Sequence, residues 1–167
     1  MAAYRRILVA TDFSAASDLA LEEGIRIAAE MGATLAILHV YQVPLSGWQP
    51  AGAVSRNHRA RSDAERSLSR RLLRAWRRRI ATTPILEQGQ PDRKIVEVAE
   101  RERADLIVMG TRGPTERLIL GSVAARVVAN APCAVLTMCT RLAEVRLEDE
   151  LKPTRPEVAA APGGSEA

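Results

Sequence analysis

Aromatic residues and cysteines are both scarce in this chain of 167 residues. Aromatic residues make up 3% of the sequence and are scattered along it, so a platform that stacks nucleic-acid bases is not expected. The two cysteines exclude a disulfide-rich scaffold and a four-cysteine zinc site. If Cys133 and Cys139 lie on one extended strand, about 20 Å separates them, which is beyond disulfide reach.

Long hydrophobic runs are missing as well. No apolar stretch approaches the roughly 20 residues needed to cross a bilayer, and the run that follows Arg5-Arg6 stops at Thr11-Asp12, too early for an export signal. We therefore expect a cytoplasmic protein with no membrane segment. The length suits one domain, predicted over residues 1–140. Residues 141–167 are rich in Pro, Gly, Ala and Glu and are predicted to be a largely disordered tail.

The net charge of +4 is concentrated in one segment. Between Ser55 and Arg79, ten arginines stand against only Asp63 and Glu65, so this segment carries +8 and the rest of the chain −4. One interpretation is a surface that binds polyanions such as nucleic acid or acidic lipid, weakly and without sequence preference. The other, which we favour, is a solvated helix face whose long side chains cover apolar surface.

Short apolar runs alternate with helical patterns along the chain. The arginine-rich helix is predicted to begin after a loop over Gln42–Asn57, and to bury a stripe that includes Trp76. Acidic residues of the first helix (Asp18, Glu22, Glu23) are predicted to form its solvated face. The predicted strands are Arg6–Ala10, Thr34–Tyr41, Pro84–Glu87, Asp105–Met109 and Cys133–Met138, and the predicted helices are Ala15–Met31, His58–Ile80, one after Gly89–Asp92 and one capped by Ser122.

This alternation predicts an α/β fold. Strands that are apolar on both faces imply a parallel sheet covered by helices on both sides, and right-handed crossovers make it doubly wound. In such sheets ligands bind beyond the carboxyl ends of the strands, where the strand order switches. That rule points to Ala10-Thr11-Asp12, Val40-Tyr41 and Met109-Gly110.

Glycines stand on both sides of one predicted loop. The segment Met109-Gly110-Thr111-Arg112-Gly113 is followed by seven residues and then by Gly121-Ser122-Val123. Glycine lets backbone N–H groups approach an anion, and the positive end of the last helix points into the same space. This pattern is typical of a phosphate site, and a tight turn with an ordinary serine cap would produce it too.

Other nucleotide and catalytic motifs are absent. The chain has neither Gly-x4-Gly-Lys-Ser/Thr nor, after the first strand, Gly-x-Gly-x-x-Gly. No hydrolytic triad is evident, because His39 stands near the end of a buried strand and is interpreted as a structural histidine. We therefore predict that the protein is not an enzyme.

Several segments, taken in order, resemble the universal stress protein family over residues 4 to 138. The resemblance implies a five-stranded sheet of order 3-2-1-4-5 and often a dimer. In that order the last strand, Ala134 to Met138, is an apolar edge, so we expect a homodimer that pairs through it. The segments that carry the resemblance are Arg6 to Ser14, Leu38 to Val40, Gly89 to Pro91, Ala104 to Gly113, Gly121 to Val123 and Ala131 to Leu136.

The resemblance also implies a ligand. ATP-binding members of the family carry a Gly-x2-Gly-x9-Gly-Ser/Thr motif, and ATP is expected here, with Mg²⁺ as an accompanying ion. On that pattern Asp12 and Val40 would hold the adenine. The phosphates and ribose would face Gly110, Gly113, Gly121 and Ser122, and the remaining predicted site residues are Ala10, Thr11, Met109, Arg112 and Val123.

The chain departs from the family pattern between Gly113 and Gly121, where seven residues stand in place of nine. The first hypothesis is a stress-response protein that binds ATP and acts by nucleotide-dependent signalling or partner interaction. The alternative is a dimeric interaction module that binds no nucleotide and meets acidic partners through the arginine-rich helix. A third hypothesis, an ATP-pyrophosphatase-like enzyme, is disfavoured because Thr11-Asp12-Phe13-Ser14 replaces its Ser-Gly-Gly-x-Asp-Ser loop.

Overall fold

The computed structural model describes residues 4–42, 53–111 and 120–139. Strands and helices alternate along these residues, as the apolar runs predict. The strands are β1 (Arg6–Ala10), β2 (Thr34–Tyr41), β3 (Thr82–Gln88), β4 (Leu106–Gly110) and β5 (Ala134–Met138), and the helices are α1 (Ala15–Met31), α2 (Ala53–Arg77), α3 (Pro91–Arg101) and α4 (Ser122–Asn130). The predicted tail, residues 141–167, lies outside the described residues.

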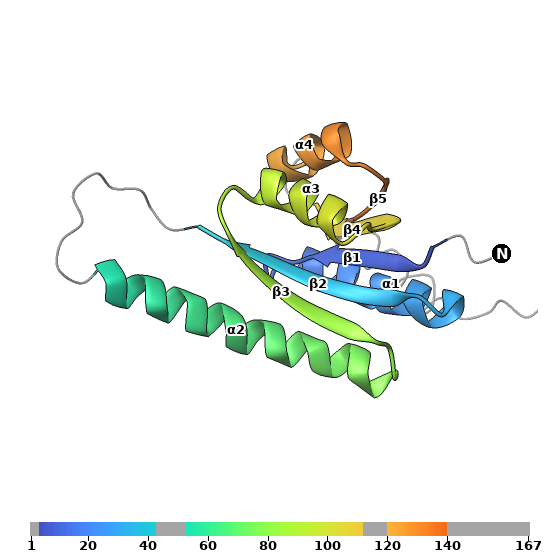
Figure 1. Ribbon diagram of the computed structural model, residues 1–167, viewed down its shortest axis with the longest axis horizontal. Coiled ribbons are helices and arrows are strands. Elements are labelled where there is room, and N and C mark those ends of the chain that lie inside the picture. Colours follow the sequence, from blue (N-terminus) through green and yellow to red (C-terminus); the bar gives the residue numbers. More distant parts are fainter. Residues whose placement is uncertain (1–3, 43–52, 112–119, 140–167) are drawn as a thin grey trace, which may run out of the picture.

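The five strands form one parallel sheet of order β3-β2-β1-β4-β5, which confirms the predicted fold class. Helices α1 and α2 cover one face, and α3 and α4 cover the other (Figure 1). Alternate residues of β1 supply the two cores: Ile7 and Val9 pack towards α1 and α2, whereas Leu8 and Ala10 pack towards α3 and α4. Both faces of the central strand are therefore buried, as expected for a doubly wound sheet.

Helix α1 has the boundaries that its sequence predicts. Ser14 caps its N-terminus by accepting a hydrogen bond from the N–H of Ser17 at 3.3 Å. Gly32 ends it in the left-handed conformation, with a φ of 64°. Gly24 lies where the helix passes over β1, and a Cβ there would stand 2.5 Å from Cγ2 of Val9. The glycine thus lets α1 pack directly on the central strand.

The largest differences from the predicted boundaries are in α2 and β3, whereas β4 and β5 differ by at most one residue at each end. Helix α2 begins at Ala53, inside the predicted loop Gln42–Asn57, and ends at Arg77. Strand β3 begins at Thr82, two residues before the predicted start at Pro84. Proline has no backbone N–H to donate. Because β3 is an edge strand, no neighbouring strand on its outer side requires an N–H from Pro84, so the strand continues through this residue.

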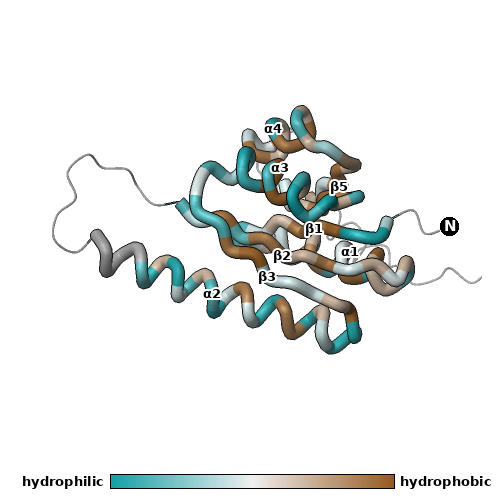
Figure 2. The backbone as a smooth tube through the Cα atoms, viewed as in Figure 1, coloured by the Kyte–Doolittle hydropathy of each residue, from teal (hydrophilic) through white to brown (hydrophobic). Residues whose placement is uncertain are grey.

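The buried stripe of α2 is narrower than predicted. Leu68 and Leu72 are buried in the core that α1 shares, but the Trp76 side chain is 54% exposed and Leu73 is 49% exposed. The prediction that Trp76 lies on the buried stripe is therefore wrong. Helix α2 crosses only the β2 and β3 side of the sheet (Figures 1 and 2), so its contact face is too narrow to cover Trp76.

The acidic face of α1 also differs from the prediction. Asp18 and Glu22 form ion pairs with arginines of α2, Asp18 with Arg71 at 2.7 Å and Glu22 with Arg74 at 3.2 Å. Glu23 pairs with Arg26 on its own helix at 2.6 Å. This face is therefore not simply solvated, because part of it contacts the arginine-rich helix.

Cys133 and Cys139 are both free, as their predicted separation requires. In the described part of the chain, no helix is both long enough and apolar enough to span a membrane.

Neighbouring leucines of α2 test its orientation. Leu72 is 5% exposed and Leu73 is 49% exposed. Leu72→Ala should lower the free energy of unfolding by about 2–5 kcal/mol, because it leaves a cavity in the core. Leu73→Ala is the matched control and should change it by no more than about 0.5 kcal/mol. Urea unfolding followed by circular dichroism measures both, and equal losses would contradict the orientation.

Candidate functional site

A cavity of about 550 Å³ lies at the carboxyl ends of β1, β2 and β4, where the strand order switches. Such a volume is typical of small-molecule sites. Two of the predicted site residues, Arg112 and Gly113, lie outside the described residues. The structure brings the other nine together on the cavity wall: Ala10, Thr11, Asp12, Val40, Met109, Gly110, Gly121, Ser122 and Val123.

Sequence reasoning missed the part of the wall that helices supply. Ser14 and the first turn of α1 line the cavity next to Asp12, and Pro91 and Ile95 of α3 line it near Val40. The rule that ligands bind at strand ends names only the strand residues. The cap residue Ser14 and the turn before Pro91 were the available signals, since both mark helices that begin at this edge.

The cavity floor is apolar. Ala10, Leu38 and Met109 lie in the carboxyl-terminal halves of their strands and line the cavity, with relative exposures of 7% or less. Val40 and Val123 are half-buried and stand on the wall. A flat, uncharged group such as a nucleobase would find van der Waals contact on this floor.

The N-terminus of α4 lines the cavity. Gly121 is its N-cap and Ser122 its first residue, so the prediction that Ser122 caps the helix is wrong by one position. Among the described residues no side chain caps this helix, and its first turn contains no acidic residue. The free N–H groups and the positive end of the helix dipole therefore remain available to an anion.

The other two helices whose first turns line the cavity are less suited to an anion. Ser14 already accepts a hydrogen bond from the first turn of α1, and Asp18 lies in that turn. Helix α3 has Pro91, which lacks an N–H, and Asp92 in its first turn. Asp92 pairs with Arg126 of α4 at 2.7 Å. Of the three helix starts, α4 is the one that favours negative charge.

Asp12 provides a carboxylate on the cavity wall. Its Oδ1 accepts a hydrogen bond from the N–H of Ser14 at 3.0 Å. Partial burial by itself would raise the pKa of Asp12, but hydrogen bonds from Ser14 and Ser17 outweigh burial and hold this pKa below its usual value. Asp12 is therefore ionised at neutral pH and accepts hydrogen bonds only.

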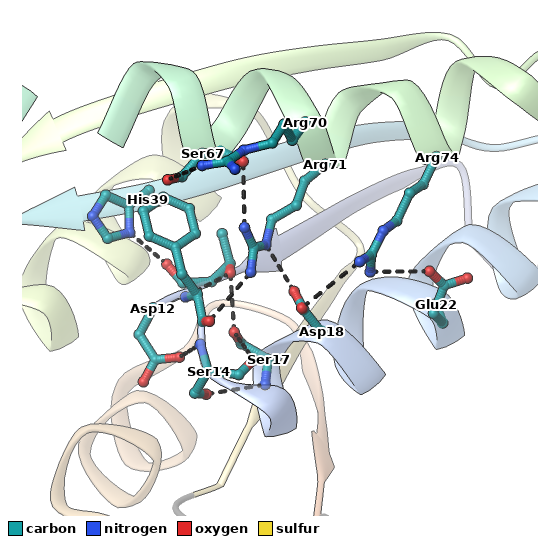
Figure 3. Close-up of polar contacts among 12 residues, drawn as sticks. Asp12, Ser14, Ser17, Asp18, Glu22, His39, Ser67, Arg70, Arg71 and Arg74 are labelled. Atoms are coloured by element: carbon teal, nitrogen blue, oxygen red, sulfur yellow. Dashed lines mark hydrogen bonds and ion pairs between the residues drawn. The ribbon is translucent and has the colours of Figure 1, made fainter. Parts of the chain in front are cut away.

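His39 faces away from this cavity. Its Nδ1 lies 2.7 Å from the carbonyl oxygen of Thr11, and its ring stacks on Phe13 with 4.0 Å between centroids. Burial lowers the pKa of His39, although the Thr11 contact and nearby Asp12 oppose the shift. Neutral and held in this way, His39 acts as a structural residue, as interpreted from the sequence (Figure 3).

Gly110 has a packing role that the glycine pattern did not indicate. A Cβ at this position would stand 2.6 Å from the carbonyl carbon of Ala16 and 2.6 Å from the amide nitrogen of Ser17. These are backbone atoms of the first turn of α1, which cannot rotate away. Gly110 therefore allows α1 to lie directly over the end of β4, and it lines the cavity at the same time.

Among the residues that the structure describes, no three His, Cys, Asp or Glu side chains gather as a metal site. The fold and the cavity define a doubly wound α/β protein with a small-molecule pocket at its switch point.

The chain belongs to the universal stress protein family, whose model matches residues 3–138. Universal stress protein MJ0531 of Methanocaldococcus jannaschii is 37% identical over 141 residues, which cover 81% of this chain and 82% of that protein. The structure of universal stress protein UspA from Lactobacillus plantarum is similar, with 27% identity, a TM-score of 0.72 and coverage of 81% and 97% of the two chains.

A further similar structure is that of a universal stress protein in complex with cAMP. It is 26% identical, with a TM-score of 0.64, and the match covers 82% of this chain and 98% of that one.

Proposed function

We propose that the cavity binds an adenine nucleotide, ATP, and that the protein is a cytoplasmic stress-response protein acting through nucleotide-dependent signalling or partner interaction. The observation that carries this proposal is the mixed polarity of the cavity lining. The lining combines a helix start that has no acidic residue in its first turn, the Asp12 carboxylate and apolar strand residues. A nucleotide has parts that match each of these groups: phosphates, a polar ribose and a flat base.

The polarity also orients the ligand. The phosphates belong beside Gly121 and Ser122, where backbone N–H groups and the helix dipole compensate their charge. The base belongs near Val40, with Asp12 accepting hydrogen bonds from amino or hydroxyl groups. Mg²⁺, where it accompanies ATP, would be held mainly by the phosphates and water. The relative solved with cAMP supports an adenine nucleotide as the ligand class.

The proposal is for binding rather than catalysis. His39, whose imidazole could serve as a general base, is engaged by the Thr11 carbonyl and lies outside the cavity lining. A general base must contact the proton that it removes, and Asp12, with its lowered pKa, is a weak base. A conformational response to the bound nucleotide is therefore the proposed output.

Two valines of α4 test the nucleotide site. Val123 lines the cavity, whereas Val128 is 49% exposed and is not part of its lining. ATP titrated into the unmodified protein should give a binding isotherm by calorimetry. Val123→Trp should weaken binding at least tenfold because the indole fills space that the nucleotide needs, and Val128→Trp is the matched control.

Absence of heat with millimolar ATP in the unmodified protein would contradict the proposal. The interaction module without nucleotide would then be the better description of the protein.

We also propose that the protein is a homodimer that pairs through β5. This strand is the edge of the sheet. The carbonyl of Met138 accepts a hydrogen bond from the Thr111 N–H at 2.7 Å, so Met138 directs its backbone groups towards β4. Backbone groups alternate along a strand, so those of Thr137 and Val135 point to the free edge and are available to a second copy.

A proline at the free edge tests the dimer. Thr137→Pro should remove an outward N–H without breaking the pairing of β5 with β4, and should shift the protein towards monomer in sedimentation at micromolar concentration. Thr137→Val keeps the N–H and is the control. A monomeric mass for the unmodified protein would contradict this assembly.

We propose weak binding of polyanions by α2 as a second activity. Arg59, Arg70 and Arg77 recur at helical spacing on its outer face and are exposed. Arg59, Arg77 and the adjacent Arg78 and Arg79 form no ion pair with any side chain in the described ranges. Their charge is therefore available for phosphates of a nucleic acid.

Salt dependence tests this surface. Fluorescence anisotropy with labelled duplex DNA should show weak binding that fades steeply between about 50 and 150 mM salt, because counterion release drives it. Arg77→Ala with Arg78→Ala should weaken binding. The control, Arg101→Ala with Arg126→Ala, removes the same charge from α3 and α4 on the opposite face. An affinity that stays flat with salt would contradict the proposal.

A further inference from the structure

One arginine of α2 points inward instead of facing solvent. The side chain of Arg71 is 12% exposed and extends from α2 to the turn that follows β1 (Figure 3). Its Nε donates to Oδ1 of Asp18 at 2.7 Å, and its Nη2 donates to the backbone carbonyl of Phe13 at 3.2 Å. A third hydrogen bond, from Nη1 to the carbonyl of Ser67 at 3.3 Å, fixes the guanidinium on its own helix.

The turn that Arg71 contacts has an unusual backbone conformation. Phe13 has a φ of 67°, in the left-handed region that bulky residues rarely adopt. Such a conformation persists only where the surroundings hold it. Here the Phe13 ring lies between two partners: the guanidinium carbon of Arg71 is 4.6 Å from the ring centroid, and the His39 ring stacks on it 20° from parallel.

The same turn forms one wall of the nucleotide cavity. Thr11, Asp12 and Ser14 line that cavity, whereas Phe13 and Arg71 do not. The turn is also braced internally, because the Thr11 hydroxyl accepts from the Phe13 N–H at 3.1 Å. Phe13 therefore points to the α2 side while its two neighbours face the ligand side, so the Phe13 ring and the Asp12 carboxylate belong to adjacent residues of one short turn.

We infer that Arg71 is a positioning residue of the nucleotide site, which it shapes from α2 by holding Phe13 and so presenting Asp12 to the ligand. This inference rests on the proposed function. It also assigns the arginine-rich helix a role on its inner face that is separate from the exposed arginines of its outer face.

Arg74 separates this role from simple stabilisation of the helix pair. It stands one turn along α2, and its guanidinium pairs with Glu22 at 3.2 Å and Asp18 at 3.8 Å. It therefore shares with Arg71 the charge, the helix and the bridge to α1, but among the described residues it pairs only with Asp18 and Glu22 and not with the turn (Figure 3). If Arg71 only joined α1 to α2, removal of either arginine would have the same effect on ligand binding.

The experiment compares ATP binding by calorimetry in the unmodified protein, Arg71→Ala, Arg71→Lys and Arg74→Ala. We expect Arg71→Ala to weaken binding at least tenfold and Arg74→Ala to change it by less than twofold. Lysine can still pair with Asp18 but has no planar guanidinium to stack on Phe13 while it donates to the carbonyl. Arg71→Lys should therefore recover stability towards urea more fully than it recovers affinity.

A spectroscopic measurement reports the turn directly. The His39 ring protons lie over Phe13 and experience its ring current, so their NMR resonances should move in Arg71→Ala and remain in place in Arg74→Ala. This readout requires no nucleotide, and Arg74→Ala is the control for a general loss of helix packing.

The outcomes separate the two proposals. If the unmodified protein binds no ATP, the proposed function and this inference both fail. If it binds ATP and Arg71→Ala binds equally well, or if Arg74→Ala loses as much affinity, only the inference is overturned. Should Arg71→Ala not fold, Arg71→Lys decides: affinity equal to that of the unmodified protein would overturn the inference.

Discussion

The close packing of α1 against the sheet is the constraint on which the rest of the structure depends. At Gly24 and at Gly110, a single added carbon would collide with the facing element, Val9 in one case and the backbone of Ala16 and Ser17 in the other. Overpacking of this kind typically costs about 1–3 kcal/mol. Because Gly110 lets the first turn of α1 lie over the end of β4, the same contact that closes the core also builds one wall of the cavity.

Most of the fold could be predicted because it follows from local patterns. Apolar runs that are buried on both faces require a parallel sheet with helices on each side, and the boundaries of α1 follow from Ser14 and Gly32 alone. The local sequence pattern could not predict the contacts between helices and strands. Trp76 has the spacing of a buried residue, but its exposure depends on how much of α2 the sheet edge covers.

The candidate site was predictable in location and less so in construction. The rule for strand ends indicated Asp12, Val40 and Met109, because it depends only on topology. The walls supplied by α1 and α3, the exact N-cap of α4 and the packing role of Gly110 depend on distances between segments far apart in the sequence. The inward orientation of the Arg71 side chain could not be predicted for the same reason, since nothing in the local sequence distinguishes this residue among the ten arginines of its segment.

The distribution of charge around the cavity explains why the site does not resemble a cationic pocket. In the described residues, its wall carries one carboxylate, Asp12, and no lysine or arginine. An anion would therefore be compensated chiefly by backbone groups of α4, which any sequence can supply and which composition cannot reveal. Because β4 and β5 are parallel neighbours, the connection between them starts at the carboxyl edge of the sheet, and α4 is the helix of that connection. The helix start that we propose to face the phosphates thus arises from the crossover between two neighbouring strands.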